Sequence, residues 1–164
     1  MSAEGGSSSF ADMIRPGCYA SLQKSANEEQ YPTVKVRFAD YDSIPSRALL
    51  HQKDTRDATK DFLTYDEIPG VTNFSRSHLN QGKKVNKHVH PSKYEIFEVL
   101  GGEGWFYVWE IGAEEDEEPK EKIKLKRGIV VTVGPREPHA IESLASSKEP
   151  LVMTYVGIVA PEEK

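Results

Sequence analysis

Hydrophobic and polar residues alternate along most of the chain after residue 31, with the period of two that is typical of a half-buried β-strand. The clearest segment is YPTVKVRFADYD at residues 31–42, where Val34, Val36 and Phe38 alternate with polar or small residues. Further short segments of this kind follow, about 8 to 12 residues apart and separated by turn-forming or charged residues. This spacing predicts an all-β domain, either a sandwich or a barrel.

The segment GWFYVWEI, residues 104–111, departs from the alternation because both of its faces are apolar. A strand of this type is buried on both sides. The outer face of residues 105–109, together with Ile96 and Leu100, would give one domain more exposed hydrophobic surface than a monomer usually leaves open. We therefore expect a homodimer, unless residues 10–30 of the same chain cover this surface.

At 164 residues the chain has the size of one domain. We expect a disordered tail at residues 1–9, which are rich in Gly and Ser, an N-terminal extension at residues 10–30, and the β-domain at residues 31–160. Residues 114–122, EEDEEPKEK, form a run of charges, which we interpret as a solvated loop between two strands. An acidic surface that binds a partner is the alternative for this loop.

The composition excludes several classes of protein. Hydrophobic residues make up 37% and charged residues 29% of the chain, values typical of a globular protein. The formal net charge of −5 argues against a protein that binds nucleic acid through a basic face. No apolar run approaches the roughly 18 residues of a membrane span, and the N-terminal sequence lacks the features of a signal peptide. With Cys18 as its single cysteine, we expect a cytoplasmic protein without an internal disulfide.

Two of the five histidines, His88 and His90, are separated by one residue. On a β-strand such a pair projects from the same face, so both imidazoles can reach one cation. Glu95 follows at an odd offset and can join them only if the chain turns in between, which Pro91 makes possible. A single histidine on an apolar strand is more often a hydrogen-bonded core residue, but this combination favours a metal site.

The same residues resemble the first sequence motif of the cupin superfamily, G(X)5HXH(X)4E(X)6G. Gly82, His88, His90, Glu95 and Gly102 occupy every specified position. Five fixed residues at fixed spacing in a β-rich chain of this length make a specific signal. The resemblance extends over about residues 70–158 and implies a small cupin.

The second cupin motif, G(X)5PXG(X)2H(X)3N, is only partly matched by GIVVTVGPREPHAIES. Gly128 and His139 are in register, whereas Gly134, Arg136 and Ser143 replace the Pro, Gly and Asn of the motif. These departures leave the metal-binding histidine in place, but they border the mouth of the pocket. They therefore weaken any inference of substrate from close relatives.

The resemblance implies a jelly-roll β-barrel that binds one divalent transition metal through His88, His90, Glu95 and His139. Three imidazoles and one carboxylate suit Fe(II), which is our first choice, and also Mn(II), Ni(II), Cu(II) or Zn(II). Four protein ligands on an octahedral ion leave two positions for water, O2 or a chelating substrate.

Other residues are expected to line the pocket. Phe97 and Val99 lie on the same face of their strand as the predicted glutamate ligand and should form the wall beside the metal. Arg76 and His78 share a face of the preceding strand and would line the pocket if that face points inward. Arg136, close to the last histidine ligand, is a candidate partner for an anionic substrate. His78 and Arg136 are therefore also candidates for a catalytic role.

The cupin fold hosts many reactions, so three functions remain open. Our first interpretation is an Fe(II)-type dioxygenase of a small, anionic organic molecule. The alternatives are a non-oxidative isomerase, epimerase or lyase, and a ligand-binding module without turnover. Cupin lyases that act on dimethylsulfoniopropionate carry Tyr where this chain has Phe97, and cupin epimerases of sugar nucleotides use a His/Asp pair. The remaining candidates for a general base are Glu95, His78, Tyr94, Tyr107 and Tyr155.

Overall fold

The structure is a computed structural model, and all the residues it describes belong to one compact unit, Val34–Lys164. The described residues are 40–49, 58–64 and 67–160. The predicted tail at residues 1–9 and the extension at residues 10–30 lie outside them, as does most of the strand predicted at residues 31–42. The prediction is wrong for the end of that strand, because Tyr41–Ser43 forms a 3-10 helix. The Asp40 side chain caps this helix by accepting a hydrogen bond from Asp42 N.

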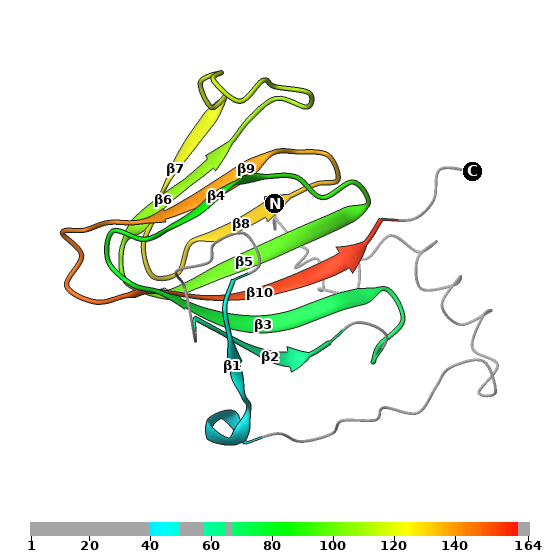
Figure 1. The fold of residues 1–164 in the computed structure, drawn as a ribbon, viewed down its shortest axis with the longest axis vertical. Helices are drawn as coiled ribbons and strands as arrows, with labels where there is room; N and C mark the ends of the chain where they lie inside the picture. The colour runs from blue at the N-terminus through cyan, green and yellow to red at the C-terminus, as the bar shows by residue number, and fades with distance from the viewer. Residues whose placement is uncertain (1–39, 50–57, 65–66, 161–164) are drawn as a thin grey trace, which may run out of the picture. The chain divides into compact units, whose positions relative to one another are not determined.

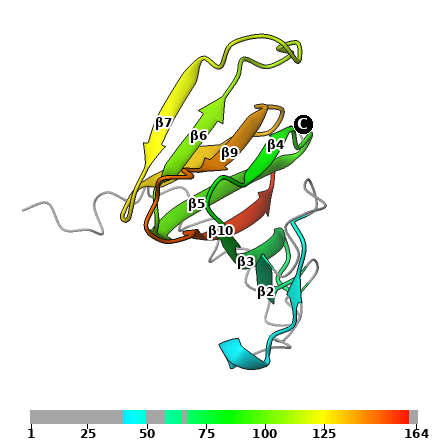
Figure 2. The same cartoon turned by 60° about the vertical axis from the view of Figure 1, so that its left-hand side comes forward.

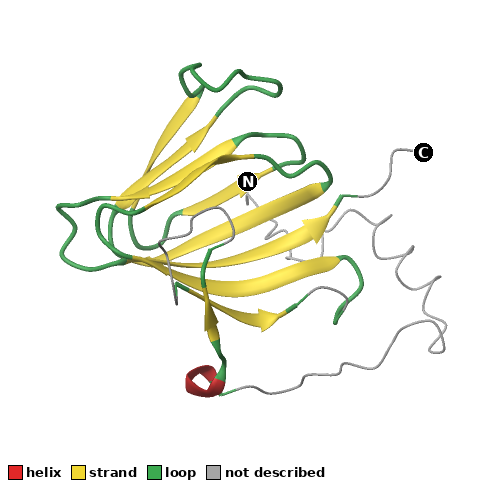
Figure 3. Ribbon diagram, in the orientation of Figure 1, coloured by secondary structure: helices red, strands yellow, loops and turns green. Residues whose placement is uncertain are grey.

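The remaining elements of the described residues are β-strands, which confirms the all-β prediction (Figure 3). The strands are β1 (Ser46–Arg47), β2 (Thr59–Leu63), β3 (Val71–Leu79), β4 (Lys84–His88), β5 (Lys93–Gly101), β6 (Gly104–Val108), β7 (Glu121–Leu125), β8 (Val130–Val133), β9 (His139–Ser143) and β10 (Leu151–Val159).

The strands form two antiparallel sheets. The larger sheet has the order β1-β2-β3-β10-β5-β8, and the smaller sheet has the order β4-β9-β6-β7 (Figure 1). Figure 2 shows the two sheets as separate layers, and loops at both ends of the strands connect them. Strands β4 and β9 are distant in sequence but are neighbours in the smaller sheet, so the crossovers bring the segment around the histidine pair against the strand that carries His139.

Strand β5 shows how the alternation in sequence positions the site. Glu95, Phe97 and Val99 share one face, as predicted, and are buried toward the smaller sheet, whereas Glu98 is exposed on the other face. Phe97 packs edge-on against Phe106 of β6, with ring centroids 5.2 Å apart. The two sheets therefore share a core in which aliphatic residues and these two rings meet.

Gly102 closes the turn after β5 and explains one fixed position of the motif. Its φ angle is +74°, which L side chains rarely adopt, and a Cβ atom there would lie 2.3 Å from the carbonyl oxygen of Pro150. Any larger residue would push apart the turn and the start of β10.

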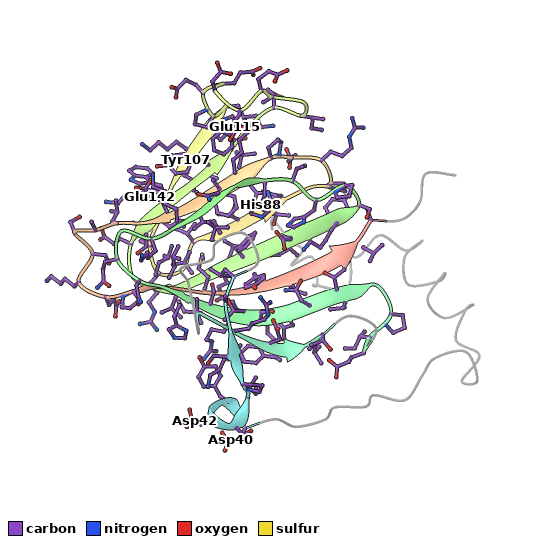
Figure 4. The ribbon with its side chains drawn as sticks, in the orientation of Figure 1. Asp40, Asp42, His88, Tyr107, Glu115 and Glu142 are labelled. Carbon is purple, nitrogen blue, oxygen red and sulfur yellow. The ribbon has the colours of Figure 1, made fainter. Side chains whose placement is uncertain are left out.

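The apolar outer face of β6 is partly covered within the domain. The Lys122 ammonium lies 4.6 Å from the ring centroid of Trp105, and that of Lys87 lies 4.9 Å from Trp109. The Tyr107 hydroxyl donates to Glu142 Oε2 at 2.9 Å, and Figure 4 shows these two side chains beside each other. This face is thus half-buried by polar and cationic neighbours.

The charge run at residues 114–122 lies mostly in the loop between β6 and β7, which confirms the predicted loop. Most of its side chains are exposed, and Glu115 marks this loop in Figure 4. Among the described residues there is no helix long and apolar enough to span a membrane.

Candidate metal centre

His88, the first histidine of the cluster, lies at the end of β4 and faces His139. His88 pairs with His139 of β9, and their ring centroids are 4.3 Å apart (His88 is labelled in Figure 4). The register of this pairing shifts between Val85 and His88, as at a β-bulge. His90 lies beyond the strand, so regular strand alternation does not hold it, yet its ring centroid is 5.0 Å from that of His88.

Two of the imidazoles are oriented by backbone carbonyls. His88 Nδ1 lies 2.8 Å from the carbonyl oxygen of Asn86, and His139 Nδ1 lies 3.0 Å from that of Glu137. If Nδ1 carries the proton and donates to these carbonyls, Nε2 keeps its lone pair for a metal, the usual arrangement around metal-binding histidines. Nε2 of His139 is buried and makes no hydrogen bond within the described part of the chain.

Glu95 supplies a carboxylate between the imidazoles. Its Oε2 atom lies 3.2 Å from Nε2 of His90 and 3.2 Å from Nε2 of His139, while Lys93 Nζ lies 2.7 Å from Oε1. Burial alone raises the pKa of the Glu95 carboxyl, but its contacts with the two histidines and with Lys93 outweigh burial and hold this pKa well below its usual range. Glu95 is therefore an anion at neutral pH.

The four residues of the first prediction come together: one ligand atom from each of His88, His90, Glu95 and His139 lies within 4.8 Å of the others. The buried, unbonded Nε2 of His139 and the ionised carboxylate are the groups that a divalent cation would satisfy. The donor set therefore fits a transition metal, and the cluster can hold one ion.

Three residues of the cluster, His88, His90 and Glu95, line one wall of a cavity of about 340 Å³, whereas His139 is buried behind them and does not line it. Phe97 lines this cavity, as predicted, and Leu49, Leu79, Ile141 and Met153 make the rest of the wall mainly apolar. A cavity of this size accommodates a small organic molecule, and its few polar groups would fix the orientation of that molecule.

The polar groups on the other side of the cavity form a closed network. Arg47 binds Asp61 with two hydrogen bonds, from Nε to Oδ2 at 2.5 Å and from Nη2 to Oδ1 at 2.7 Å. The Ser75 hydroxyl donates to Asp61 Oδ1 at 2.7 Å and accepts from Asn73 Nδ2 at 3.1 Å. Both charges of the ion pair are thus satisfied within the protein.

Tyr155 lies between the histidine cluster and the network of Arg47 and Asp61. On β10 it pairs with Phe97 on one side and with Ser75 on the other, and its ring stacks on Phe97 with an interplanar angle of 19°. Burial is the main cause that raises the pKa of its hydroxyl above the ordinary value. Tyr155 is therefore a protonated hydrogen-bond donor at neutral pH and lines the cavity.

Arg76 and His78 do not line the cavity, contrary to one expectation. On β3 the buried residues are Ser75, Ser77 and Leu79, so the alternation turns the other two outward. The Arg76 guanidinium lies 5.1 Å from the ring centroid of Tyr41 on that outer face. Burial and nearby positive charges lower the pKa of His78, which favours its neutral form.

Val99 and Arg136 do not line the cavity either. Val99 has the predicted orientation but lies two residues beyond Phe97, within the closed core. Arg136 has a φ of +65°, which places it at a turn where glycine is favoured, as in the cupin motif. Its backbone N–H donates to the His90 carbonyl at 2.7 Å, and its side chain is exposed.

The sequence analysis missed three charged residues of the cavity, Arg47, Asp61 and Lys93. Lys93 has an even offset from Glu95 on one strand, and this signal could have placed it on the same face. Arg47 lies in a segment without clear periodicity, and only its pairing with β2 brings it to the cavity. Tyr155 is the tyrosine among the predicted base candidates that lines the cavity; Tyr94 is exposed.

Solved structures with this arrangement of strands are known, whereas no family model and no curated protein matches the sequence. A predicted oxalate decarboxylase from Thermotoga maritima is 21% identical, with a TM-score of 0.61 over 74% of this chain and 98% of that chain. A Klebsiella pneumoniae protein with a double-stranded β-helix domain is 17% identical, with a TM-score of 0.52 over 79% and 95%. A cupin protein from Bacteroides fragilis is 22% identical, with a TM-score of 0.49 over 73% and 88%.

These identities establish the likeness of the fold and leave the reaction open. The spacing of the motif from Gly82 to Gly102, the two antiparallel sheets and the similar structures agree with one another. The described part of the chain therefore has a double-stranded β-helix fold.

Proposed function

We propose that this protein is a metal-dependent enzyme that oxygenates a small organic anion. The observation that carries this proposal is the convergence of His88, His90, Glu95 and His139 beside a cavity of about 340 Å³, which the first three of these residues line. Fe(II) is our first choice of metal, since a set of imidazole and carboxylate ligands suits it. A bound metal would supply positions at which O2 and substrate bind side by side.

The chain's own residues would orient the substrate and exclude water from it. The apolar wall, which includes Phe97, Leu49 and Met153, favours a molecule with an apolar body. The Tyr155 hydroxyl would donate a hydrogen bond to a polar group of the substrate. The paired Arg47 and Asp61 would present a wall without net charge to the far end of the molecule.

Metal analysis of the purified protein, followed by O2 uptake with small acids and phenols, tests this function. We expect about one metal ion per chain and O2 consumption that depends on both metal and substrate. Turnover that continues unchanged without O2 would remove the oxygenase. Tight ligand binding without turnover under any metal would leave a binding module.

A non-oxidative isomerase or lyase is the second candidate, and Tyr155 is the observation that favours it. A protonated hydroxyl inside the cavity can act as a general acid, which proton-transfer reactions need and oxygenation does not. The similarity in fold to a predicted oxalate decarboxylase is compatible with this chemistry. Under anaerobic conditions Tyr155→Phe should slow such a reaction by about a hundredfold or more, while metal content stays unchanged.

We also propose that the protein is a homodimer. Ile96 and Leu100 are only half-buried, and Phe74, Tyr94 and Ile158 are exposed in the larger sheet. A two-fold interface is the commonest way to cover such a surface. The mass in solution at tens of micromolar tests this, and Ile96→Glu should shift a dimer toward the monomer. A monomeric wild-type mass would contradict the proposal.

A further inference from the structure

The carboxylate of Glu95 has a different partner on each of its oxygens. Oε2 faces the imidazoles of His90 and His139, at 3.2 Å from each Nε2. Oε1 lies 2.7 Å from Nζ of Lys93, a side chain that is only 19% exposed and lines the same cavity. Lys93 therefore holds the carboxylate from the side opposite to the metal-binding group.

The backbone of β10 is shaped to admit the Lys93 side chain. Gly157 pairs with Glu95 on β5 and with Asn73 on β3. A Cβ atom at Gly157 would lie 3.0 Å from Cδ of Lys93, 2.6 Å from Oδ1 of Asn73 and 2.2 Å from Oγ1 of Thr72. Only glycine leaves this space open, and the strand register shifts directly after it, as at a β-bulge.

Among the residues that the structure describes, neither the predicted Arg136 nor the Arg47 that lines the cavity is available to bind an anion in the same way. The Arg136 side chain is exposed and does not line the cavity. The Arg47 guanidinium donates two hydrogen bonds to Asp61, which neutralises its charge. Lys93 carries three N–H donors on its ammonium group, so its bond to Glu95 leaves donors for a ligand.

We propose that Lys93 is the anion-recognition residue of the metal site, holding Glu95 with Oε2 toward the imidazoles and binding the carboxylate of a small organic acid. The proposal rests on the proposed function, because the anion would bind beside the metal. A divalent cation, the Glu95 anion and the Lys93 cation together leave a net charge of about +2, which attracts an anion in a partly buried cavity. Lys93 thus selects acids over neutral molecules of the same size.

Lys93→Met should change metal affinity and acetate affinity in different directions. This difference distinguishes a role of Lys93 in anion recognition from a purely structural role. The variant keeps the apolar stem and removes the charge. Metal should bind as tightly as in wild type or more tightly, because the positive charge that opposes the cation is gone. Acetate should bind the Co(II)-loaded variant about tenfold more weakly, since a charge-assisted hydrogen bond is lost.

The experiment measures the dissociation constant of Co(II) by calorimetry and then titrates the loaded protein with acetate, followed by the visible absorption of Co(II). Imidazole, a neutral ligand, should bind wild type and Lys93→Met equally. Lys93→Arg keeps the charge and should retain most of the acetate affinity. Lys124→Met is the matched control, because Lys124 forms a similar ion pair, at 3.7 Å from Glu103, on the exposed surface of β7.

The outcomes separate the two proposals. If wild type binds no Co(II), both the metal site and the role of Lys93 are wrong. If wild type binds Co(II) but Lys93→Met keeps its acetate affinity, only the role of Lys93 is wrong. A parallel loss of metal affinity, imidazole binding and melting temperature in Lys93→Met would show that Lys93 merely supports the fold, and would also overturn the proposal.

Discussion

Each end of the cavity contains a carboxylate with cationic or polar neighbours, but the two ends differ in how fully their hydrogen bonds are satisfied. At one end, two imidazoles and a lysine surround the Glu95 carboxylate, and the buried Nε2 atom of His139 makes no hydrogen bond within the described residues. At the other end, Arg47 and Ser75 satisfy the Asp61 carboxylate. At the first end, donor atoms of four residues lie within 4.8 Å of one another, whereas the charges of the second end are already balanced.

Under the proposed function, this difference predicts which end would react and which end would only hold the substrate. Buried groups that lack a partner are costly, so a protein keeps them where a ligand supplies the partner. The balanced pair of Arg47 and Asp61 attaches the two-residue strand β1 to β2 without any ligand. We therefore expect changes at the first end to alter metal binding, and changes at the second end to alter stability.

Loss of His139 should have the largest effect. His139→Ala should abolish turnover and most of the metal binding, because one of the four proposed ligands is removed. Wild type should gain about 2.7 kcal/mol of stability at a metal concentration one hundred times its Kd, and the variant should gain almost none. Thermal melts with and without added metal measure this, and His78→Ala, on the outer face of β3, is the control. An equal gain in both variants would contradict the site.

Breaking the ion pair at the other end should reduce stability and leave the metal bound. Arg47→Met should cost about 1 to 2 kcal/mol, because Asp61 loses two hydrogen bonds while both side chains stay partly in contact with water. The double variant Arg47→Met with Asp61→Leu should recover part of that loss, since it leaves no unpaired charge. Urea unfolding measures the effect. Additive losses in the double variant would show that the pair is not coupled.

The pH dependence of stability should identify the same pair. Burial raises the pKa of the Asp61 carboxyl, but hydrogen bonds from Arg47 and Ser75 outweigh burial and lower it. Asp61 thus contributes stability above its unfolded pKa of about 3.9, and this contribution is lost as pH falls through the lowered folded value. Wild type and Asp61→Asn should therefore differ most at neutral pH and converge in acid. A constant difference between pH 7 and pH 3 would rule out this linkage.

Arg136→Ala should have the smallest effect. Because this side chain is exposed and does not line the cavity, metal content and the apparent affinity for a substrate should stay within about twofold of wild type. Dialysis against metal and a substrate titration test this. A tenfold loss of affinity would restore Arg136 as the charge partner at the entrance and argue against Lys93.

The sequence alone predicted much of the fold and of the candidate metal site. The period of two placed Glu95, Phe97 and Val99 on one buried face, and the motif predicted the four residues whose donor atoms converge within 4.8 Å. These features depend on local geometry, because strand alternation and fixed spacing determine which side chains share a face.

Only the tertiary structure decided which residues complete the cavity. Whether β3 turns Arg76 or Ser77 inward depends on the sheet it joins, since alternation gives two faces but does not say which one is buried. The partnership of Arg47 with Asp61 depends on the pairing of β1 with β2, and the space for Lys93 depends on Gly157 of β10, far from it in sequence. Packing and strand order determine the contacts between distant segments, and a local pattern of residues does not predict those contacts.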